Sequence, residues 1–321
     1  MNKITKFFGI DVSKEVFDVT TDQGNHFQFT NNAEGHEKLS DLLDESCQCV
    51  MEATGSYHQS LASWIFAKGH AVSVVNPLVI KRFAQMRLRL AKTDKADSKM
   101  IQRYGESEGP ALWNPPQEFV SQAFEINGLV SLLIRQRTAL KNKLHSVSQK
   151  PGNFSIVTKA ITKEVQQLDR QVASLESSME QLIRSHQGEL FVNLCSIPGI
   201  GKKTAMFLIV VTNGFANFEN SKQLSAYLGL APTIRRSGSS VRGQSRISKT
   251  GNGAIRNLLF MCSFTACEKN KACRELFSRL VEKGKSKKLA LIAVANKLIK
   301  QALAIAKNGG LYNENYQMNL Q

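Results

Sequence analysis

The first 110 residues alternate short apolar runs with helical patterns, and this order limits the possible folds more than any other feature of the chain. Three apolar runs within the first 30 residues are separated by turn residues, which predicts an antiparallel meander. The predicted elements are strands at 6–11, 15–21 and 26–30, a helix at 32–45, a strand at 47–52, a helix at 56–68, a strand at 70–75 and a helix from Pro77. The order βββαβαβα is typical of an α/β domain with a mixed sheet and helices on its faces.

Four carboxylates occupy places in this order where a sheet would bring them together. Asp11 ends the first strand and Glu52 ends the fourth, so if these strands are neighbours both acids emerge at one edge. Asp94 and Asp97 share one face of the last predicted helix. Hard divalent cations take oxygen ligands, and two such ions stabilise the attacking and leaving oxygens of a phosphodiester displacement. We therefore predict a catalytic metal site for Mg²⁺, or Mn²⁺, at Asp11, Glu52, Asp94 and Asp97.

A simpler interpretation of these acids remains open. Asp94 and Asp97 also suit an ordinary surface helix, paired with the lysines at positions 92, 95 and 99. Asp18 and Glu15 are rival acids on the second strand, but we expect Asp18 to face outward. The strand order and the acid positions resemble the ribonuclease H-like fold of RuvC-like nucleases and recombinases.

The chain is strongly basic, with 42 Lys and Arg residues against 26 Asp and Glu residues and a net charge of +16. This balance favours nucleic acid or another anionic surface as the partner. No apolar run reaches the ~18 residues of a membrane span, and the six cysteines lack the spacing of a zinc site. We expect an intracellular, cytoplasmic protein without a membrane partner.

Turn residues and periodicity predict three domains, at 1–112, 113–189 and 190–321. Pro115 and Pro116 follow the first domain, and the second carries two apolar stripes with heptad spacing. Arg137 fills the one missing apolar step, and Pro151-Gly152 divides the stripes. We expect either an antiparallel helical hairpin or two arms of a coiled coil, contributing to oligomerisation. An internal spacer packed on the other domains is the alternative.

The last domain is predicted to be mainly helical and carries two patterns typical of phosphate binding. The segment from Leu194 to Ile209 resembles a helix-hairpin-helix, in which glycines expose backbone N–H groups and a helix N-terminus favours an anion. It also suits a plain helical turn. A basic loop rich in Gly and Ser then separates two helices, and its simplest function is to bind phosphate. Alternatively one of its serines is a nucleophile, among Ser237, Ser239, Ser240, Ser245 and Ser248.

The residues predicted to contact nucleic acid are basic side chains and turn glycines in the first and last domains. They are Lys81, Arg82, Arg87, Arg89, Lys92, Gly199, Gly201, Lys202, Lys203, Arg235, Arg236, Arg242, Arg246, Lys249 and Arg256.

A set of ordered motifs covers nearly the whole chain. They are GIDVSKE, VMEATGSYHQSLASWI, KTDKADSKMI, IPGIGKKTA, LSAYLGLAP, RRSGSS and ISKTGNGAIRNLLF. Together they resemble the insertion-sequence transposases with a DEDD RuvC-like domain, a family that also includes Piv-type DNA invertases.

This resemblance implies a serine-using, Mg²⁺-dependent DNA recombinase. The family acids map to Asp11, Glu52, Asp94 and Asp97, and the family serine maps to Ser237. Ser239 is the alternative, because many members have Ser-Ser-Gly-Gly where this chain has Arg-Ser-Gly-Ser from Arg236. The resemblance also implies a structured guide RNA, which selects donor and target DNA by base pairing. It further implies dimers that assemble into tetramers with composite sites from different subunits.

The leading hypothesis is therefore an insertion-sequence transposase that cleaves and exchanges DNA strands through a serine–DNA link. Three alternatives remain: a metal-dependent hydrolytic nuclease or junction resolvase, a Piv-type site-specific invertase, and a nucleic-acid-binding scaffold without catalysis.

Overall fold

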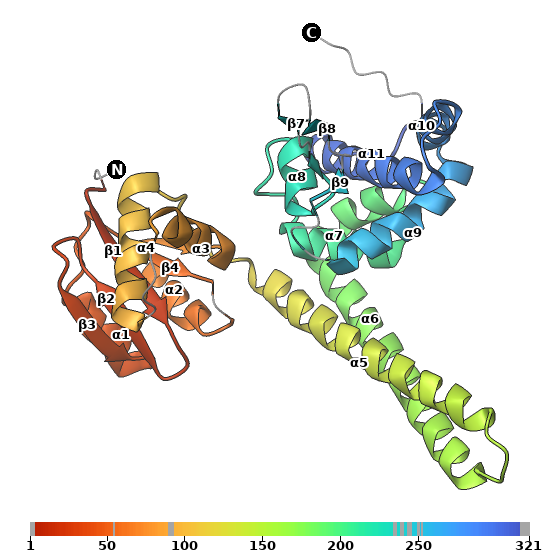
Figure 1. The fold of residues 1–321 in the computed structure, drawn as a ribbon, viewed down its shortest axis with the longest axis horizontal. Coiled ribbons are helices and arrows are strands. Elements are labelled where there is room, and N and C mark those ends of the chain that lie inside the picture. The colour runs from red at the N-terminus through yellow and green to blue at the C-terminus, as the bar shows by residue number, and fades with distance from the viewer. Residues whose placement is uncertain are drawn as a thin grey trace. The chain divides into compact units, whose positions relative to one another are not determined.

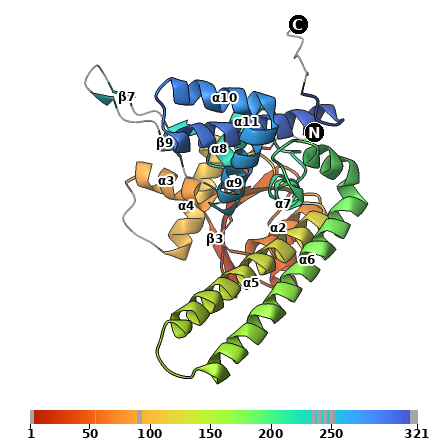
Figure 2. The same cartoon turned by 90° about the vertical axis from the view of Figure 1, so that its right-hand side faces the viewer.

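The structure is a computed structural model that describes residues 4–53, 55–88, 93–233, 236–237, 241–242, 246–248, 251 and 253–314 (Figures 1 and 2). The chain divides into two compact units, Met1–Pro115 and Pro116–Gln321. The predicted division into three domains stays a prediction.

The first unit is built on a five-stranded mixed sheet, as predicted. Its strands are β1 (Lys6–Val12), β2 (Val16–Thr20), β3 (His26–Thr30), β4 (Cys47–Glu52) and β5 (Ala71–Val75). The spatial order is β3-β2-β1-β4-β5. β2 pairs antiparallel with both β1 and β3, whereas β4 pairs parallel with β1 and with β5. The first and fourth strands are therefore neighbours, which is the condition on which the predicted acidic site depends.

Helices cover both faces of this sheet. They are α1 (Ala33–Ser40), α2 (His58–Ala67), α3 (Pro77–Met86) and α4 (Asp94–Glu108). On one face, Leu39 of α1 and Leu61 of α2 pack with Ile10 in a core of fully buried side chains. On the other face, Ile80 of α3 and Ile101 of α4 pack against Val50 and Val75. The two faces alternate along each strand, as burial on both sides of a sheet requires.

The expectation of one final helix in this unit was wrong. α3 ends at Met86, and Leu88 has a left-handed φ of 52°. α4 then begins after Thr93, whose side chain accepts a hydrogen bond of 3.3 Å from the backbone N–H of Ala96. A capping threonine followed by acids in the first turn starts a helix efficiently. The acids therefore sit at a helix N-terminus and not within a longer helix.

The second unit begins with two long helices, α5 (Glu118–Ser148) and α6 (Ser155–Cys195), which lie side by side in both views (Figures 1 and 2). Arg137, the residue at the gap in the apolar stripe, donates from Nη1 to Asp169 Oδ1 of α6 over 2.7 Å. α6 departs from helical geometry at Gln187. A role for this pair in oligomerisation stays a prediction.

Nine further elements complete the described part of the second unit. They are α7 (Lys202–Thr212), α8 (Ser221–Tyr227), α9 (Gly253–Lys269), α10 (Lys271–Glu282) and α11 (Lys287–Asn308), with two-residue strands β6 (Pro232–Thr233), β7 (Arg236–Ser237), β8 (Val241–Arg242) and β9 (Arg246–Ile247). By length and composition alone, α11 passes the test for a membrane-crossing helix. Its side chains Val294, Leu298 and Ile299 nevertheless lie fully buried in the core with those of α7 and α9. The apolar character of α11 is therefore explained by packing.

Candidate metal centre and nucleic-acid-binding elements

A glycine in β1 sets how closely α4 lies on the sheet. A Cβ placed on Gly9 would lie 2.1 Å from the backbone oxygen of Ser98 and 2.2 Å from the backbone nitrogen of Gln102. The hydroxyl groups of Thr20 and Ser98 hydrogen-bond over 2.8 Å in the buried contact between β2 and α4. α4 thus rests its backbone directly against β1, which a larger side chain at Gly9 would prevent.

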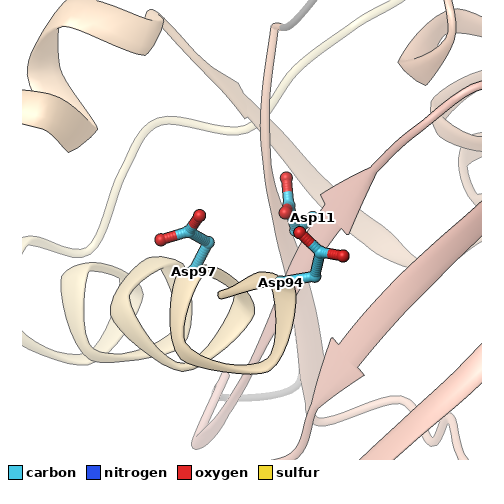
Figure 3. Close-up of side chains that lie close together, drawn as sticks. All are labelled: Asp11, Asp94 and Asp97. Carbon is cyan, nitrogen blue, oxygen red and sulfur yellow. The ribbon is translucent and has the colours of Figure 1, made fainter. Parts of the chain in front are cut away.

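Strand periodicity then directs Asp11 toward the same helix. Asp11 follows Gly9 by two positions and so faces the same side of the sheet. The first turn of α4 brings Asp94 and Asp97 to this point (Figure 3). One carboxylate oxygen from each of Asp11, Asp94 and Asp97 lies within 4.8 Å of those of the other two. The three acids come from a strand end and a helix start far apart in sequence.

Glu52, the fourth predicted acid, lies on the neighbouring strand at the same edge. β4 is parallel to β1 with Ile10 opposite Met51, so Asp11 and Glu52 both follow this pair. Glu52 is outside the group of three carboxylates that lie within 4.8 Å. Its charge nevertheless acts on Asp11 and helps to raise the pKa of that carboxyl. The structure therefore brings three predicted acids together and places the fourth beside them.

The electrostatics of this group favour a cation. Burial and then the charges of Asp97, Asp94, Glu52 and Asp18 raise the pKa of Asp11 from 3.8 to about 6. Among the described residues, which do not include Lys92, neither Asp11 nor Asp94 forms an ion pair within 4.0 Å. Carboxylate oxygens are the ligands that Mg²⁺ and Mn²⁺ prefer. The donor set and its mutual repulsion thus fit a divalent cation.

The expectation that Asp18 faces outward was wrong. Asp18 is 4% exposed and lies directly opposite Asp11 in the β1–β2 ladder, so both side chains project to the face that α4 covers. Its Oδ1 accepts hydrogen bonds from His26 Nε2 at 2.8 Å and from Gln28 Nε2 at 3.3 Å. α4 packs against β2 as well as β1, so it covers this face of the strand. β3 thus satisfies the rival acid.

The helix-hairpin-helix-like turn lies between α6 and α7. Gly199 has a φ of 108°, and a Cβ there would lie 2.7 Å from the Cβ of Ala266 in α9, so this glycine is required for packing. Gly201 has open space in the direction of a Cβ. Lys202 Nζ lies 3.0 Å from Glu180 Oε1, and Lys203 Nζ lies 2.7 Å from Glu176 Oε1. Both predicted phosphate ligands thus pair with carboxylates of α6.

The predicted serine nucleophile lies in the second unit, whereas the acids lie in the first. Ser237 ends β7 and is opposite Val241 of β8, and the predicted contact residues Arg236 and Arg242 are opposite each other. Arg246 lies in β9. Part of the basic segment thus forms short strand pairs and is not one continuous loop.

The other predicted contact residues are dispersed. Lys81, Arg82 and Arg87 are exposed on or just after α3. Arg256 is half-buried, and its Nη1 donates to the carbonyl oxygen of Gly251 over 3.0 Å. Several predicted residues lie outside the described part of the chain, namely Arg89, Lys92, Arg235, Ser239, Ser240, Ser245 and Lys249.

The sequence analysis missed Gly9 and the two α6 carboxylates, Glu176 and Glu180, and it placed Asp18 on the wrong side of the sheet. A signal existed for Gly9, since a glycine inside an apolar strand often marks a close backbone approach. No local signal links Glu176 and Glu180 to lysines more than 20 residues away.

Comparisons with known proteins decide the family. A DEDD-type transposase model matches residues 8–149, and a model of the IS116/IS110/IS902 transposase family matches residues 192–278. The pilin gene-inverting protein of Moraxella bovis is 33% identical over 319 residues, which cover 94% of this chain and 95% of that protein. The chain belongs to the IS116/IS110/IS902 family of transposases. The resemblance inferred from the sequence motifs is thereby confirmed.

More distant members of this transposase family match over similar lengths. The transposase for insertion sequence element IS1111A of Coxiella burnetii is 23% identical over 330 residues, covering 92% of this chain and 88% of that protein. Both parts of the chain that carry predicted site residues therefore lie within matched regions. The chain is a DNA-acting recombinase or transposase, and its acidic group falls within the DEDD model.

Proposed function

We propose that this transposase is a metal-dependent recombinase of an insertion sequence, which cleaves and exchanges DNA strands through a serine–DNA link under the guidance of a structured RNA. The observation that carries the proposal is the convergence of Asp11, Asp94 and Asp97, with oxygens within 4.8 Å of one another, at the edge where Glu52 also emerges. Because the chain belongs to a family that rearranges DNA, we assign the phosphodiesters of DNA as the substrate of this site.

Asp11, Asp94, Asp97 and Glu52 would hold Mg²⁺ or Mn²⁺ in this proposal. A bound ion would supply charge neutralisation for the phosphodiester displacement. The residues themselves supply a fixed set of oxygen ligands, because α4 packs closely on β1 at Gly9 and is held on β2 by the Thr20–Ser98 hydrogen bond. This rigid support suits a site whose function is positioning and electrostatic stabilisation.

Ser237 is the nucleophile in the proposed reaction, with Ser239 as the alternative. Its Oγ attacks the phosphorus of a DNA phosphodiester, a new O–P bond forms, and the bond from phosphorus to the 3′ oxygen breaks. The serine proton passes to solvent, and the departing 3′ oxygen takes up a proton to become a hydroxyl. The fragment downstream of the break remains attached to serine through its new 5′ phosphate, so the bond energy is kept for rejoining and no nucleotide cofactor is needed.

RNA guidance and assembly into dimers and tetramers belong to the same proposal. The motif resemblance supports all of them, and the net charge of +16 favours a polyanionic partner such as RNA. Base pairing between the RNA and DNA would then choose the target, while side chains contact the backbones.

The decisive experiment is a denaturing gel of the purified protein, with co-purified RNA retained, after incubation with labelled element-junction DNA and Mg²⁺. We expect label to migrate with the wild-type protein and with Ser239→Ala, and no label on protein for Ser237→Ala. Free cleaved DNA without an adduct in every sample would favour the hydrolytic nuclease. An adduct lost only in Ser239→Ala would move the nucleophile to Ser239.

A site-specific invertase is the second candidate, favoured by the 33% identity to a protein named for gene inversion. A plasmid carrying two element junctions in inverse orientation separates the candidates. Inversion by RNA-free protein would support the invertase, whereas integration that requires added RNA supports the guided transposase.

A further inference from the structure

A hollow of about 620 Å³ lies between α10 and α11 of the second unit. Its lining comes from residues spaced by three or four on each helix, including Leu276 and Arg279 on α10 and Ala293, Lys297 and Lys300 on α11. Such spacing places one stripe of each helix along a shared groove. The groove therefore has an apolar floor with cationic side chains along it.

Three cations of this groove lack a carboxylate partner within the described part of the chain. Among the residues that the structure describes, Arg279, Lys297 and Lys300 form no ion pair within 4.0 Å. Glu275 is the one acid that lines the groove. By contrast, Lys202 and Lys203 of the same unit are both paired with glutamates. The positive charge of the groove is thus available to an external anion.

A positioned amide accompanies these cations. Asn296 lines the groove, and its side-chain Oδ1 accepts a hydrogen bond of 2.9 Å from the hydroxyl of Ser225, which is 4% exposed. This contact fixes the side chain and leaves its amide N–H groups for another acceptor. Phosphate oxygens accept hydrogen bonds from both amides and cationic groups.

The surroundings of the groove extend the charge well beyond one binding group. The segment from Lys269 to Lys307 contains eleven Lys and Arg residues and two Glu residues. Lys283, Lys285, Lys287 and Lys288 are exposed in and beside the turn that joins the two helices. A continuous basic surface of this kind suits a polyanion with repeated phosphates better than a single small anion.

We infer that the α10–α11 groove is a binding surface for the phosphate backbone of duplex DNA, separate from the site of strand cleavage. Duplex DNA is the occupant because the family acts on DNA and because the groove presents donors for a backbone and no aromatic side chain on which an unpaired base could stack. Its function is to hold a segment of duplex DNA through the phosphate backbone, independently of the base sequence.

The test compares two triple variants that lose the same charge. The first carries Arg279→Gln, Lys297→Gln and Lys300→Gln in the groove. The matched control carries Lys141→Gln, Lys163→Gln and Arg170→Gln, three exposed cations of α5 and α6. Affinity for a labelled DNA duplex is measured by fluorescence anisotropy over a series of salt concentrations in EDTA. Cleavage does not occur under these conditions, so the result is independent of the proposed nucleophile and metal.

The slope of log binding constant against log salt concentration should become shallower by about 0.9 for each phosphate contact that is lost. For three lost contacts the groove variant should therefore differ from wild type by about 2 to 3 in slope. It should also bind more weakly at every salt concentration. The control should keep the wild-type slope. Arg279→Lys alone should also keep it, because the charge remains. Equal slopes for groove variant and control would overturn the inference. A slope that changes with duplex RNA of the same length, but not with DNA, would overturn the assignment to DNA.

Discussion

At the scale of single residues, Asp11 is placed where its own ionisation is opposed. It is partly buried, and four other carboxylates act on it, so its pKa lies near 6 where 3.8 is usual. Carboxyls whose pKa is raised by burial and by neighbouring negative charges are common at functional sites, because a bound cation offsets the repulsion. The acid thus makes the protein without metal less stable and the metal-bound protein more stable.

Asp11→Asn should therefore stabilise the metal-free protein at neutral pH and abolish stabilisation by metal. A pKa of about 6 against 3.8 sets an upper limit of about 3 kcal/mol on the gain. Thermal unfolding in EDTA and in Mg²⁺ measures both effects. An Asp11→Asn protein that Mg²⁺ stabilises as much as wild type would contradict the metal site.

The same residue gives a defined pH dependence. The folded-state pKa of Asp11 is raised, so the folded protein binds this proton at a higher pH than the unfolded chain does. The destabilisation is complete above about pH 6 and is relieved as the pH falls toward 4. In EDTA, the difference in melting temperature between Asp11→Asn and wild type should shrink over this window. If the difference in melting temperature does not vary with pH, the pKa of the Asp11 carboxyl is not raised in the folded protein.

Gly9→Ala should displace α4, because the new Cβ would meet backbone atoms of Ser98 and Gln102 that cannot rotate away. Overpacking of this kind costs about 1–3 kcal/mol, and metal binding should weaken with it. Gly128→Ala is the matched control, since a Cβ there meets nothing within 4 Å. It should leave metal affinity unchanged and stabilise α5 by up to about 1 kcal/mol. Equal metal affinity in Gly9→Ala and wild type would refute the role of this contact.

At the scale of elements, α6 holds the two lysines that open α7. Lys202 and Lys203 pair with Glu180 and Glu176, although a helix N-terminus with lysines would attract phosphate by itself. All four groups lie at the surface, where such ion pairs add little to stability. In the predicted role of these lysines, the glutamates would compete with nucleic acid for them.

Glu176→Gln with Glu180→Gln should raise affinity for duplex DNA several-fold at low salt and change the melting temperature little. The control is Glu164→Gln with Glu189→Gln, two exposed acids of the same helix that remove equal charge. Anisotropy titrations in EDTA compare the two. If both double variants gain equally, general charge and not the α6–α7 pairing is responsible.

At the scale of the whole molecule, the proposed reaction draws on both units. The carboxylates lie in Met1–Pro115, and Ser237 lies in Pro116–Gln321. The motif resemblance implies that a cleavage site combines these units from different subunits. In that arrangement, two inactive variants with defects in different units would complement each other in a mixed assembly.

A mixture of Asp97→Asn and Ser237→Ala should therefore recover part of the wild-type cleavage and adduct formation, whereas each variant alone is inactive. The gel assay with labelled DNA measures the recovery. A double variant with both changes, mixed with Ser237→Ala, is the control and should stay inactive. No recovery in mixed assemblies would mean that each site is built within one subunit.

The sequence by itself determined the mixed sheet, the four candidate acids and the family. Strand and helix periodicity, turn residues and acids at element ends are local, so they can be read without knowing which elements meet. The division of the last helix into α3 and α4 was missed, although the capping pattern from Thr93 was present.

Tertiary structure alone decided which side chains face one another. Asp18 was expected at the surface, because a strand sequence does not reveal whether a helix covers its face, and α4 buries it. Lys202 and Lys203 were predicted to contact phosphate, and their pairing with Glu180 and Glu176 was not foreseen. That pairing depends on how α7 folds back on α6, which the sequence does not reveal. The α10–α11 groove likewise exists only once the two helices pack. Contacts between distant segments depend on packing geometry, which no local pattern encodes.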